Sequence, residues 1–273
     1  MRIGYQGEAF SYSHRAVGEL FPDAVASGHA SFVEAFQGLE DGDVERLVLP
    51  VENSTTGSVL PVLDRLPGND EHGPISIVAE HLVDVRHALL GVPGAGLDQL
   101  KYVKSHPEAL SQAEGKLMAL GLQPVPIHDT AGAVREVAAD ADPSIAALGP
   151  PEAAERHGLV VLQTDVIDRE HNTTRFVVLA PGDPQVDPDD DKTTMVFATE
   201  HRPGALALAL TELGLRGANL TRIESRPSGE AWSYHFFVDL VHDPGPDGLR
   251  HVIDPQPATL ARLKVLGSYK SVR

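Results

Sequence analysis

The chain has 273 residues, of which 42% are hydrophobic and 22% are charged, and its formal net charge is −17. This length predicts two domains, and the composition is that of a globular protein without the bias that marks disorder. The acidic balance argues against nucleic acid as a partner, since phosphates bind to basic surfaces, and no apolar run approaches the roughly 18 residues of a membrane span.

Zero cysteines exclude disulfides and thiolate catalysis. The 13 histidines are scattered, and no pair has the HxxxH or HExxH spacing of a metal site, so we expect no metal. The chain begins MRIGYQGEAFSYSH, without the apolar segment of a secretory signal, which predicts a cytoplasmic protein. In so acidic a chain, an anionic ligand must be bound locally by an arginine, a helix N-terminus or backbone N–H groups.

The first part of the chain alternates short β-like runs with helical stretches, which is the pattern of an α/β fold with mostly parallel strands. Residues 75–93 form a long β-rich stretch without a helix, which suits a crossing between two lobes. The expected strand and helix pairs lie at 2–7 and 10–21, 46–53 and 57–66, 101–107 and 107–121, 123–129 and 130–140, and 144–150 and 151–158.

The turn after the apolar run 46–53 reads ENSTTGS and collects small, hydroxyl and amide side chains. In open α/β sheets, ligands bind beyond the carboxyl ends of strands, where the next helix presents free N–H groups. Asn53, Ser54, Thr55 and Gly57 are therefore candidates for an anion site. Simple capping of the next helix by Ser54 or Thr55 is an equally favoured interpretation.

Two more strand-to-helix turns could face the same crevice. Ser11 follows the first of them, at Gly7, and Ser105 and His106 precede Pro107 at an expected helix start. The position of His106 favours a capping or packing role, and catalysis by this histidine is the alternative.

The stretch HNTTRFVVLA, residues 171–180, places hydroxyls and a guanidinium at the mouth of an apolar strand. Arg175 must reach solvent or pair with an anion, because an unpaired buried charge is too costly. On spacing alone, an exposed arginine at a strand entrance is slightly favoured. Thr174 and Arg175 point to opposite faces of the strand, so they can serve different partners.

Residues 181–191, PGDPQVDPDDD, contain three prolines and five aspartates and predict a linker. The order after it is β-α-β-β-α-β, a ferredoxin-like arrangement, whose second helix is interrupted by Pro255 and Pro257. The turn at Gly204 and the strand end NLTRIESRP could meet a ligand with both an amine and a carboxylate. A solvated, charged strand end is the favoured alternative.

Together these stretches resemble the prephenate dehydratase family across nearly the whole chain. VLPVENSTTGSV is similar to the family's ENS-containing signature, NTTRFVVL contains its Thr-Arg-Phe motif, and SHPEALSQ and HDTAGA resemble the blocks between them. RPGAL and NLTRIESRP are similar to the phenylalanine-binding motifs of the family's ACT regulatory domain. GYQGEAFS departs from the usual Gly-Pro-x-Gly-Thr-Phe-Ser, with Ala9 near the place of the threonine.

The resemblance implies an α/β fold, with a bilobal catalytic domain similar to type II periplasmic binding proteins and a ferredoxin-like ACT domain. It implies conversion of prephenate to phenylpyruvate, water and carbon dioxide, with feedback by L-phenylalanine, no cofactor and a homodimeric or homotetrameric assembly. The expected parts are the catalytic domain at 1–180, its lobes at about 1–75 plus 160–180 and at 80–155, the linker at 181–191 and the ACT domain at 192–273.

By the same resemblance, Thr174 assists the departing ring hydroxyl and Arg175 holds a carboxylate. Phenylalanine is expected between ACT domains of neighbouring subunits. A non-catalytic binding protein on the same scaffold and a dehydratase that prefers arogenate are the alternatives. The implied substrate-binding residues are Asn53, Ser54, Thr55, Gly57, Phe176 and Ser11, and the implied phenylalanine-binding residues are Gly204, Ala205, Leu206, Asn219, Glu224, Ser225 and Arg226.

Overall fold

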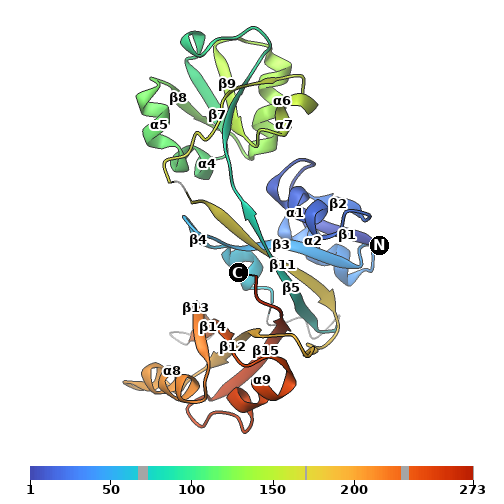
Figure 1. Ribbon diagram of the computed structural model, residues 1–273, viewed down its shortest axis with the longest axis vertical. Coiled ribbons are helices and arrows are strands. Elements are labelled where there is room, and N and C mark those ends of the chain that lie inside the picture. The colour runs from blue at the N-terminus through green and yellow to red at the C-terminus, as the bar shows by residue number, and fades with distance from the viewer. Residues whose placement is uncertain (67–72, 170, 229–233, 273) are drawn as a thin grey trace.

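The computed structural model describes residues 1–66, 73–169, 171–228 and 234–272. Three bodies follow one another along the long axis of the molecule (Figure 1). The first lobe, in blue, lies between the second lobe, in green, and the C-terminal domain, in orange and red. None of the helices in these described ranges has the length and apolar character that crossing a membrane requires.

The first lobe is a sheet with strand order β5-β11-β3-β1-β2, in which β1 runs parallel to β2 and β3, and β11 runs antiparallel to β3 and β5. Helix α1 packs on one face of this sheet, and α2 and α3 pack on the other. Its elements are β1 (Arg2–Gln6), α1 (Tyr12–Leu20), β2 (Val25–His29), α2 (Phe32–Glu40), β3 (Arg46–Asn53), β4 (Gly57–Ser58), α3 (Leu60–Leu63), β5 (Ile75–Asp84) and β11 (Thr173–Pro181).

The second lobe is a five-stranded sheet in the order β10-β6-β9-β7-β8. Helices α4 and α5 cover one face, and α6 and α7 cover the other. Its elements are β6 (Ala88–Gly91), the 3₁₀ turn η1 (Leu97–Gln99), β7 (Tyr102–Ser105), α4 (Pro107–Gln112), α5 (Glu114–Ala119), β8 (Gln123–Pro126), α6 (Thr130–Asp140), β9 (Ile145–Gly149), α7 (Ala153–Arg156) and β10 (Val160–Gln163).

The chain crosses between the lobes after β5 and again before β11. Strand β5 belongs to the sheet of the first lobe up to Asp84, and β10 pairs antiparallel with β6 in the second lobe. The expected lobe boundaries near residues 80 and 160 are therefore shifted. Residues 80–84 lie in the first lobe because β11 pairs along the whole of β5, and residues 160–163 lie in the second.

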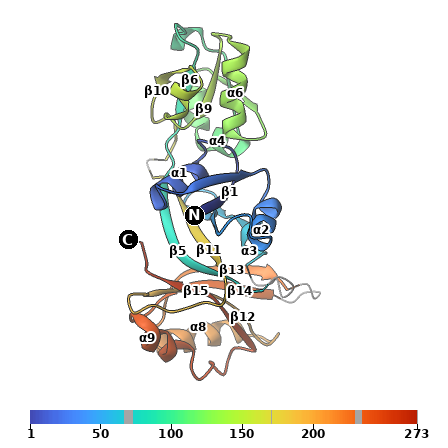
Figure 2. The ribbon, with the colours of Figure 1, turned by 90° about the vertical axis from the view of Figure 1, so that its right-hand side faces the viewer.

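The C-terminal domain has the order β-α-β-β-α-β that the sequence predicts. Its sheet has the order β13-β14-β12-β15, and α8 and α9 cover the face away from the first lobe (Figure 2). Helix α9 ends before Pro255, as expected. The elements are β12 (Lys192–Ala198), α8 (Ala205–Leu215), β13 (Asn219–Pro227), β14 (Tyr234–Val241), α9 (Gly245–Ile253) and β15 (Arg262–Tyr269).

The other face of the C-terminal sheet packs directly against the first lobe. Val196, Phe237 and Tyr269 share one apolar cluster with Leu47 and Val62 of the first lobe. At the edge, β15 pairs parallel with β5 through Gly267 and Ile77, so the two sheets form one ten-stranded sheet.

Gly267 is required at this junction by the close approach of the two backbones. A Cβ at this position would stand 2.1 Å from the carbonyl oxygen of Ile77. The aspartate-rich segment before β12 is also attached: the carboxylate of Asp191 accepts hydrogen bonds from the backbone and hydroxyl of Ser271, at 2.7 and 2.9 Å. The C-terminal domain is thus joined to the first lobe along a broad contact.

Candidate active site

The polar turn after β3 meets the start of β11 and the end of α4 where the two lobes face each other. A cavity of about 270 Å³ opens at this place. It is lined from both lobes, and the main chain that crosses between them forms part of its wall. The lining residues are Thr55, Thr56, Ser111, Gln112, Ile167, Asp168 and Arg169.

Asn53 is the buried centre of this polar turn. Its Oδ1 accepts hydrogen bonds from the backbone N–H groups of Thr55 and Thr56, at 2.9 and 3.2 Å. Since that oxygen must face these donors, the amide nitrogen of Asn53 faces the opposite way. It donates to Thr174 Oγ1 at 3.0 Å and to Asn172 Oδ1 at 2.7 Å.

Hydrogen bonds from Asn53 continue into the second lobe and return. Asn172 Nδ2 donates to Gln112 Oε1 at 2.8 Å, and Gln112 Nε2 donates to Thr55 Oγ1 at 3.0 Å. Thr55 Oγ1 then donates to Asn53 Oδ1 at 2.6 Å. We call these four side chains, Asn53, Thr55, Gln112 and Asn172, the amide ring. The amide ring ties α4 of the second lobe to β3 and β11 of the first.

The amide ring also fixes the role of Thr174. Its Oγ1 accepts a hydrogen bond from Asn53, so the hydrogen of the Thr174 hydroxyl remains free to be donated. Thr174 is half-buried, at the level of Asn53 in the pairing of β11 with β3. The structure therefore brings together two of the expected site residues, Thr174 and Asn53.

Three other residues of the expected substrate site hold the backbone in place. Ser54 Oγ accepts from the backbone N–H of Thr173 at 2.9 Å, which joins the turn to β11. Gly57 has φ +88° and opens the short strand β4, a backbone conformation that side chains rarely adopt. Ser11 caps α1 by accepting from the backbone of His14 at 3.3 Å.

Arg175 lies on the opposite side of β11, which corrects the expectation that it holds a substrate carboxylate in the cleft. Its guanidinium is paired with Asp239, with Glu80 at 3.1 Å and with Glu52 at 3.3 Å, and its side chain is 10% exposed. The pleat of β11 turns it away from Thr174 and toward the C-terminal domain. Protein carboxylates thus already occupy the positions that a bound carboxylate would take.

These groups belong to a larger set of charges, five of them buried and Glu52 half-buried, which we call the charge cluster: Glu52, Glu80, Arg175, Lys192, Arg222 and Asp239. Lys192 Nζ donates to Glu80 Oε2 at 2.7 Å. Burial alone would lower the pKa of Arg175, but Asp239 and Glu80 outweigh it and hold that pKa above its usual range. The charge cluster joins the first lobe to the C-terminal domain.

Phe176 is a core residue. It is 1% exposed and packs with Ile3, Tyr5 and Val48 between the first-lobe sheet and α1. The expectation that it contacts substrate is corrected in the same way, because its ring is enclosed beneath the strand. Of the Thr-Arg-Phe motif, the structure brings Thr174 alone to the amide ring.

Gln112 is the member of the amide ring that the sequence interpretation missed. It ends the block SHPEALSQ, in which Ser105 and His106 drew attention. His106 Nδ1 caps α4 by accepting from the backbone of Glu108 at 3.2 Å, as the capping interpretation expects, and Ser105 Oγ donates to the Leu148 carbonyl at 2.7 Å. Gln112, an uncharged amide six residues after His106 and the last residue of α4, was the signal in the sequence.

The expected phenylalanine-binding residues lie on the C-terminal domain in two separate places. Gly204, with φ +79°, caps α8, and Ala205 and Leu206 form the first turn of that helix after β12 ends. Asn219 is the first residue of β13 and pairs with Val241 of β14. Val241 in turn pairs with Lys192, the first residue of β12, so Asn219 lies at the end of the sheet where β12 begins. The Gly204 turn follows the other end of β12. Within a single chain, Asn219 and the Gly204 turn therefore lie at opposite ends of the sheet.

Glu224 and Arg226 project from β13 toward the first lobe. Glu224 Oε2 accepts from Ser58 Oγ at 2.7 Å, and Arg226 forms a bidentate pair with Asp64 at 2.6 and 2.7 Å. Ser225 alternates to the other face of the strand. These contacts place the Glu-Ser-Arg sequence beside β4, which directly follows the polar turn.

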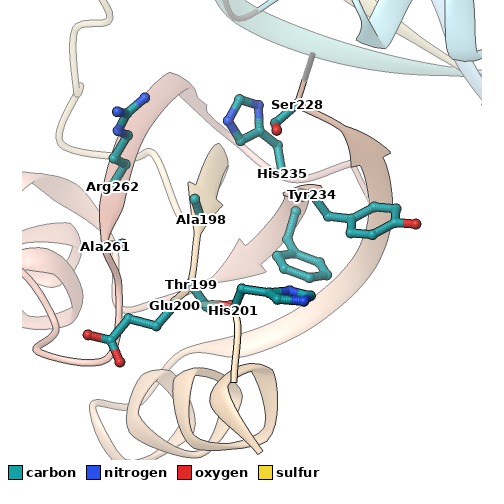
Figure 3. A pocket seen from close by; sticks show the side chains of 10 residues that line it. Ala198, Thr199, Glu200, His201, Ser228, Tyr234, His235, Ala261 and Arg262 are labelled. Atoms are coloured by element: carbon teal, nitrogen blue, oxygen red, sulfur yellow. The ribbon is translucent and has the colours of Figure 1, made fainter. Parts of the chain in front are cut away.

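A second cavity, of about 260 Å³, opens at the end of the C-terminal sheet, beside the turn that leads to Gly204. Figure 3 shows the side chains that line it, with Glu200 and His201 in the lower part of the view and Arg262 at the upper left. The lining is mixed in charge and includes the aromatic rings of Tyr234 and Phe236. A small zwitterionic molecule would fit this chemistry.

Comparison with known proteins agrees with this layout. Residues 3–184 match the family model for prephenate dehydratase, and residues 193–250 match that for the ACT domain. The chain is 37% identical to the chloroplastic arogenate dehydratase/prephenate dehydratase 2 of Arabidopsis thaliana, over 98% of this chain and 72% of that protein. It is 33% identical to the bifunctional N-acyl-homoserine lactone acylase/prephenate dehydratase of Komagataeibacter europaeus, over 98% and 95%. The solved structure of prephenate dehydratase from Arthrobacter aurescens in complex with L-Phe has a TM-score of 0.84 at 29% identity, and the match covers 99% of this chain and 90% of that one.

Proposed function

The chain belongs to the prephenate dehydratase family and carries an ACT domain, and from this premise we propose that it converts prephenate to phenylpyruvate, water and carbon dioxide under control by phenylalanine. The observation that carries the proposal is the Thr174 hydroxyl. It accepts from Asn53, which leaves its own hydrogen to be donated, and Asn53 also bonds Thr55, which lines the cavity between the lobes.

The reaction needs a donor for the leaving oxygen and little else. The bond between the ring and its carboxylate breaks, and the electron pair moves through the ring as the C–O bond breaks. One proton is taken up, so that the departing hydroxide leaves as water beside carbon dioxide. Thr174 donates a hydrogen bond to that oxygen as charge develops on it, and a positioned donor of this kind contributes about 10²–10⁴ in rate.

The amide ring is suited to this step because it is uncharged. A cation held firmly against the leaving carboxylate would stabilise the ground state and raise the barrier. The pyruvyl carboxylate of prephenate remains in the product, so a positive charge can hold it without slowing the reaction. Arg169 lines the cavity beside Thr55 and Thr56. We assign Arg169, in place of Arg175, to that carboxylate, with Ser54 and Gly57 shaping the turn.

Phenylalanine is proposed to bind between ACT domains of two subunits. Strand β13 is an end strand of its sheet, and apolar side chains on α8 and β13 are exposed: Leu208 by 48%, Ile223 by 45% and Leu215 by 84%. Exposed apolar groups beside a free strand edge favour pairing with a second copy. Such pairing could bring the Gly204 turn of one subunit near the start of β13 in another, which a single chain does not do.

A turnover assay tests both domains together. Purified protein is expected to form phenylpyruvate from prephenate, followed by absorbance, and phenylalanine is expected to change the rate. No product at any protein concentration would leave a non-catalytic binding protein as the conclusion. A higher kcat/KM for arogenate than for prephenate would assign the chain to the arogenate-preferring alternative. Calorimetry without a phenylalanine signal would remove the regulatory part.

A further inference from the structure

His87 is a buried imidazole that the proposed reaction does not use directly. It lies where the main chain crosses from β5 to β6, and it is 3% exposed. Its backbone carbonyl accepts from Val166 at 2.8 Å, so both crossings between the lobes meet at this residue. Its Nε2 lies 3.2 Å from Gln112 Oε1, and its Nδ1 lies 3.4 Å from the hydroxyl of Tyr12.

The amide ring determines which nitrogen of His87 carries the hydrogen. Backbone N–H groups can only donate, so those of Thr55 and Thr56 fix the oxygen of Asn53 and therefore its NH₂ group. That NH₂ group donates to the Asn172 oxygen, which leaves the Asn172 nitrogen to donate to Gln112 Oε1. Gln112 Oε1 is thus an acceptor, and His87 Nε2 opposite it must be the donor.

The other nitrogen of His87, Nδ1, faces Tyr12 and not the amide ring. The Tyr12 hydroxyl donates its hydrogen to the carbonyl of Arg86, so Gln112 is the group that decides the tautomer. The Tyr12 ring packs edge-on against the imidazole, with centroids 5.9 Å apart. Burial lowers the pKa of His87 and favours the neutral imidazole, in which one nitrogen is the donor.

We propose that His87 is a positioning residue of the dehydratase, whose Nε2–H bond holds Gln112 in the one orientation that lets the amide ring present Thr174 to substrate. The inference rests on the proposed function of the cleft. Gln112 Oε1 receives one hydrogen bond from His87 and one from Asn172. Without His87, the Gln112 oxygen is held by Asn172 alone, so the amide is less firmly fixed in the plane that serves Thr55 and Asn172.

The role is distinct from packing, and matched variants separate the two. His87→Phe keeps a ring of similar size and removes the donor. His87→Gln keeps an N–H group near the position of Nε2. His242→Phe is the control, because His242 is a comparably buried imidazole, 5% exposed, that bonds Thr193 in the C-terminal domain and lies away from the cleft.

The three variants and the wild-type protein are compared by kcat and KM for prephenate and by thermal unfolding. His87→Phe is expected to lower kcat about tenfold, the equivalent of one buried hydrogen bond. His87→Gln should recover to within about threefold of wild type, and His242→Phe should leave kcat unchanged. Equal kcat in His87→Phe and wild type, or no recovery in His87→Gln at equal thermal stability, would overturn the proposal.

A second measurement does not depend on the variants folding. In protein labelled with ¹⁵N-histidine, a long-range ¹H–¹⁵N spectrum distinguishes the two tautomers, and His87 is expected to carry its hydrogen on Nε2. A hydrogen on Nδ1 would contradict the inference even if prephenate is turned over. Absence of turnover by the wild-type protein would instead reject the proposed function, so the two failures are distinguishable.

Discussion

Thr174 and Arg175 are neighbours on β11 and serve two different interfaces. Thr174 joins an uncharged amide ring between the two lobes, whereas Arg175 enters a charge cluster between the first lobe and the ACT domain. The two interfaces differ in charge. In the cleft, neutral donors can stabilise the charge that develops on the leaving oxygen without stabilising the carboxylate that leaves. On the other side, buried charges of opposite sign hold two domains in one fixed geometry.

We therefore expect Thr174 to control the rate of the reaction and Arg175 to control the stability of the fold. The Thr174 hydroxyl has a free hydrogen, and its removal leaves only Asn53 with an unfilled donor. The Arg175 guanidinium has no free direction toward the cleft, and its removal leaves carboxylates of Glu80 and Asp239 that are each 1% exposed. Substitution of Thr174 should therefore lower kcat with little change in stability, whereas substitution of Arg175 should lower stability with little change in KM.

Thr174→Ala should have the largest effect, a fall in kcat of about 10²–10⁴. The free energy of unfolding should change by about 1 kcal/mol, because one neutral hydrogen bond is lost. Thr173→Ala is the control on the adjacent residue, whose hydroxyl bonds Asp84 away from the amide ring. Steady-state kinetics and urea unfolding measure both quantities, and near-normal turnover in Thr174→Ala would refute its assignment.

Arg175→Met should lower the free energy of unfolding by about 3–5 kcal/mol, because it removes a positive charge shared by two buried carboxylates, of which Glu80 keeps Lys192 and Asp239 keeps Arg222. KM for prephenate should stay near the wild-type value in the folded fraction. Arg226→Met is the matched control, since its pair with Asp64 is partly solvent-exposed and should contribute about 1 kcal/mol at most. A large rise in KM with unchanged stability would restore Arg175 to the substrate site.

Gly267→Ala tests the junction between β15 and β5. Its Cβ would meet the Ile77 carbonyl, so we expect a loss of about 1–3 kcal/mol in the free energy of unfolding. Gly214→Ala, in α8, has no neighbour within 4 Å of an added Cβ and should raise stability by about 0.5–1 kcal/mol. Equal effects of the two substitutions in denaturant unfolding would show that the sheet junction tolerates a side chain.

The smallest expected effect is on the pH dependence of stability. Burial holds the pKa of His87 below its usual 6.5. Below pH 6.5, His87 is therefore protonated more fully in the unfolded chain than in the folded chain. The free energy of unfolding should therefore fall as pH drops below about 6.5, by at most about 1.4 kcal/mol per pH unit for this group. Unfolding curves between pH 5 and 8 should be flatter for His87→Gln; an identical slope would show that His87 does not contribute.

Sequence patterns predicted the β-α-β-β-α-β order and the polar turn at Asn53 because both depend on local periodicity and turn chemistry. The opposite directions of Thr174 and Arg175 also followed from the strand alone. The partners of Arg175 did not, because Glu80 and Asp239 are distant in the chain and meet it only after the domains pack. Gln112 was missed for the same reason, since Thr55 and Asn172 lie on another lobe.

The shared sheet makes the ACT domain difficult to remove or exchange. A truncation at residue 191 would take away β15 and leave β5 with a newly free edge, and unpaired strand edges invite association between molecules. It would also remove Lys192 and Asp239, so that Glu80 and Arg175 would keep their pair with each other but lose their partners from the ACT domain. Engineering a chimera with another effector domain would therefore require redesign of β5 and β11 together with the graft.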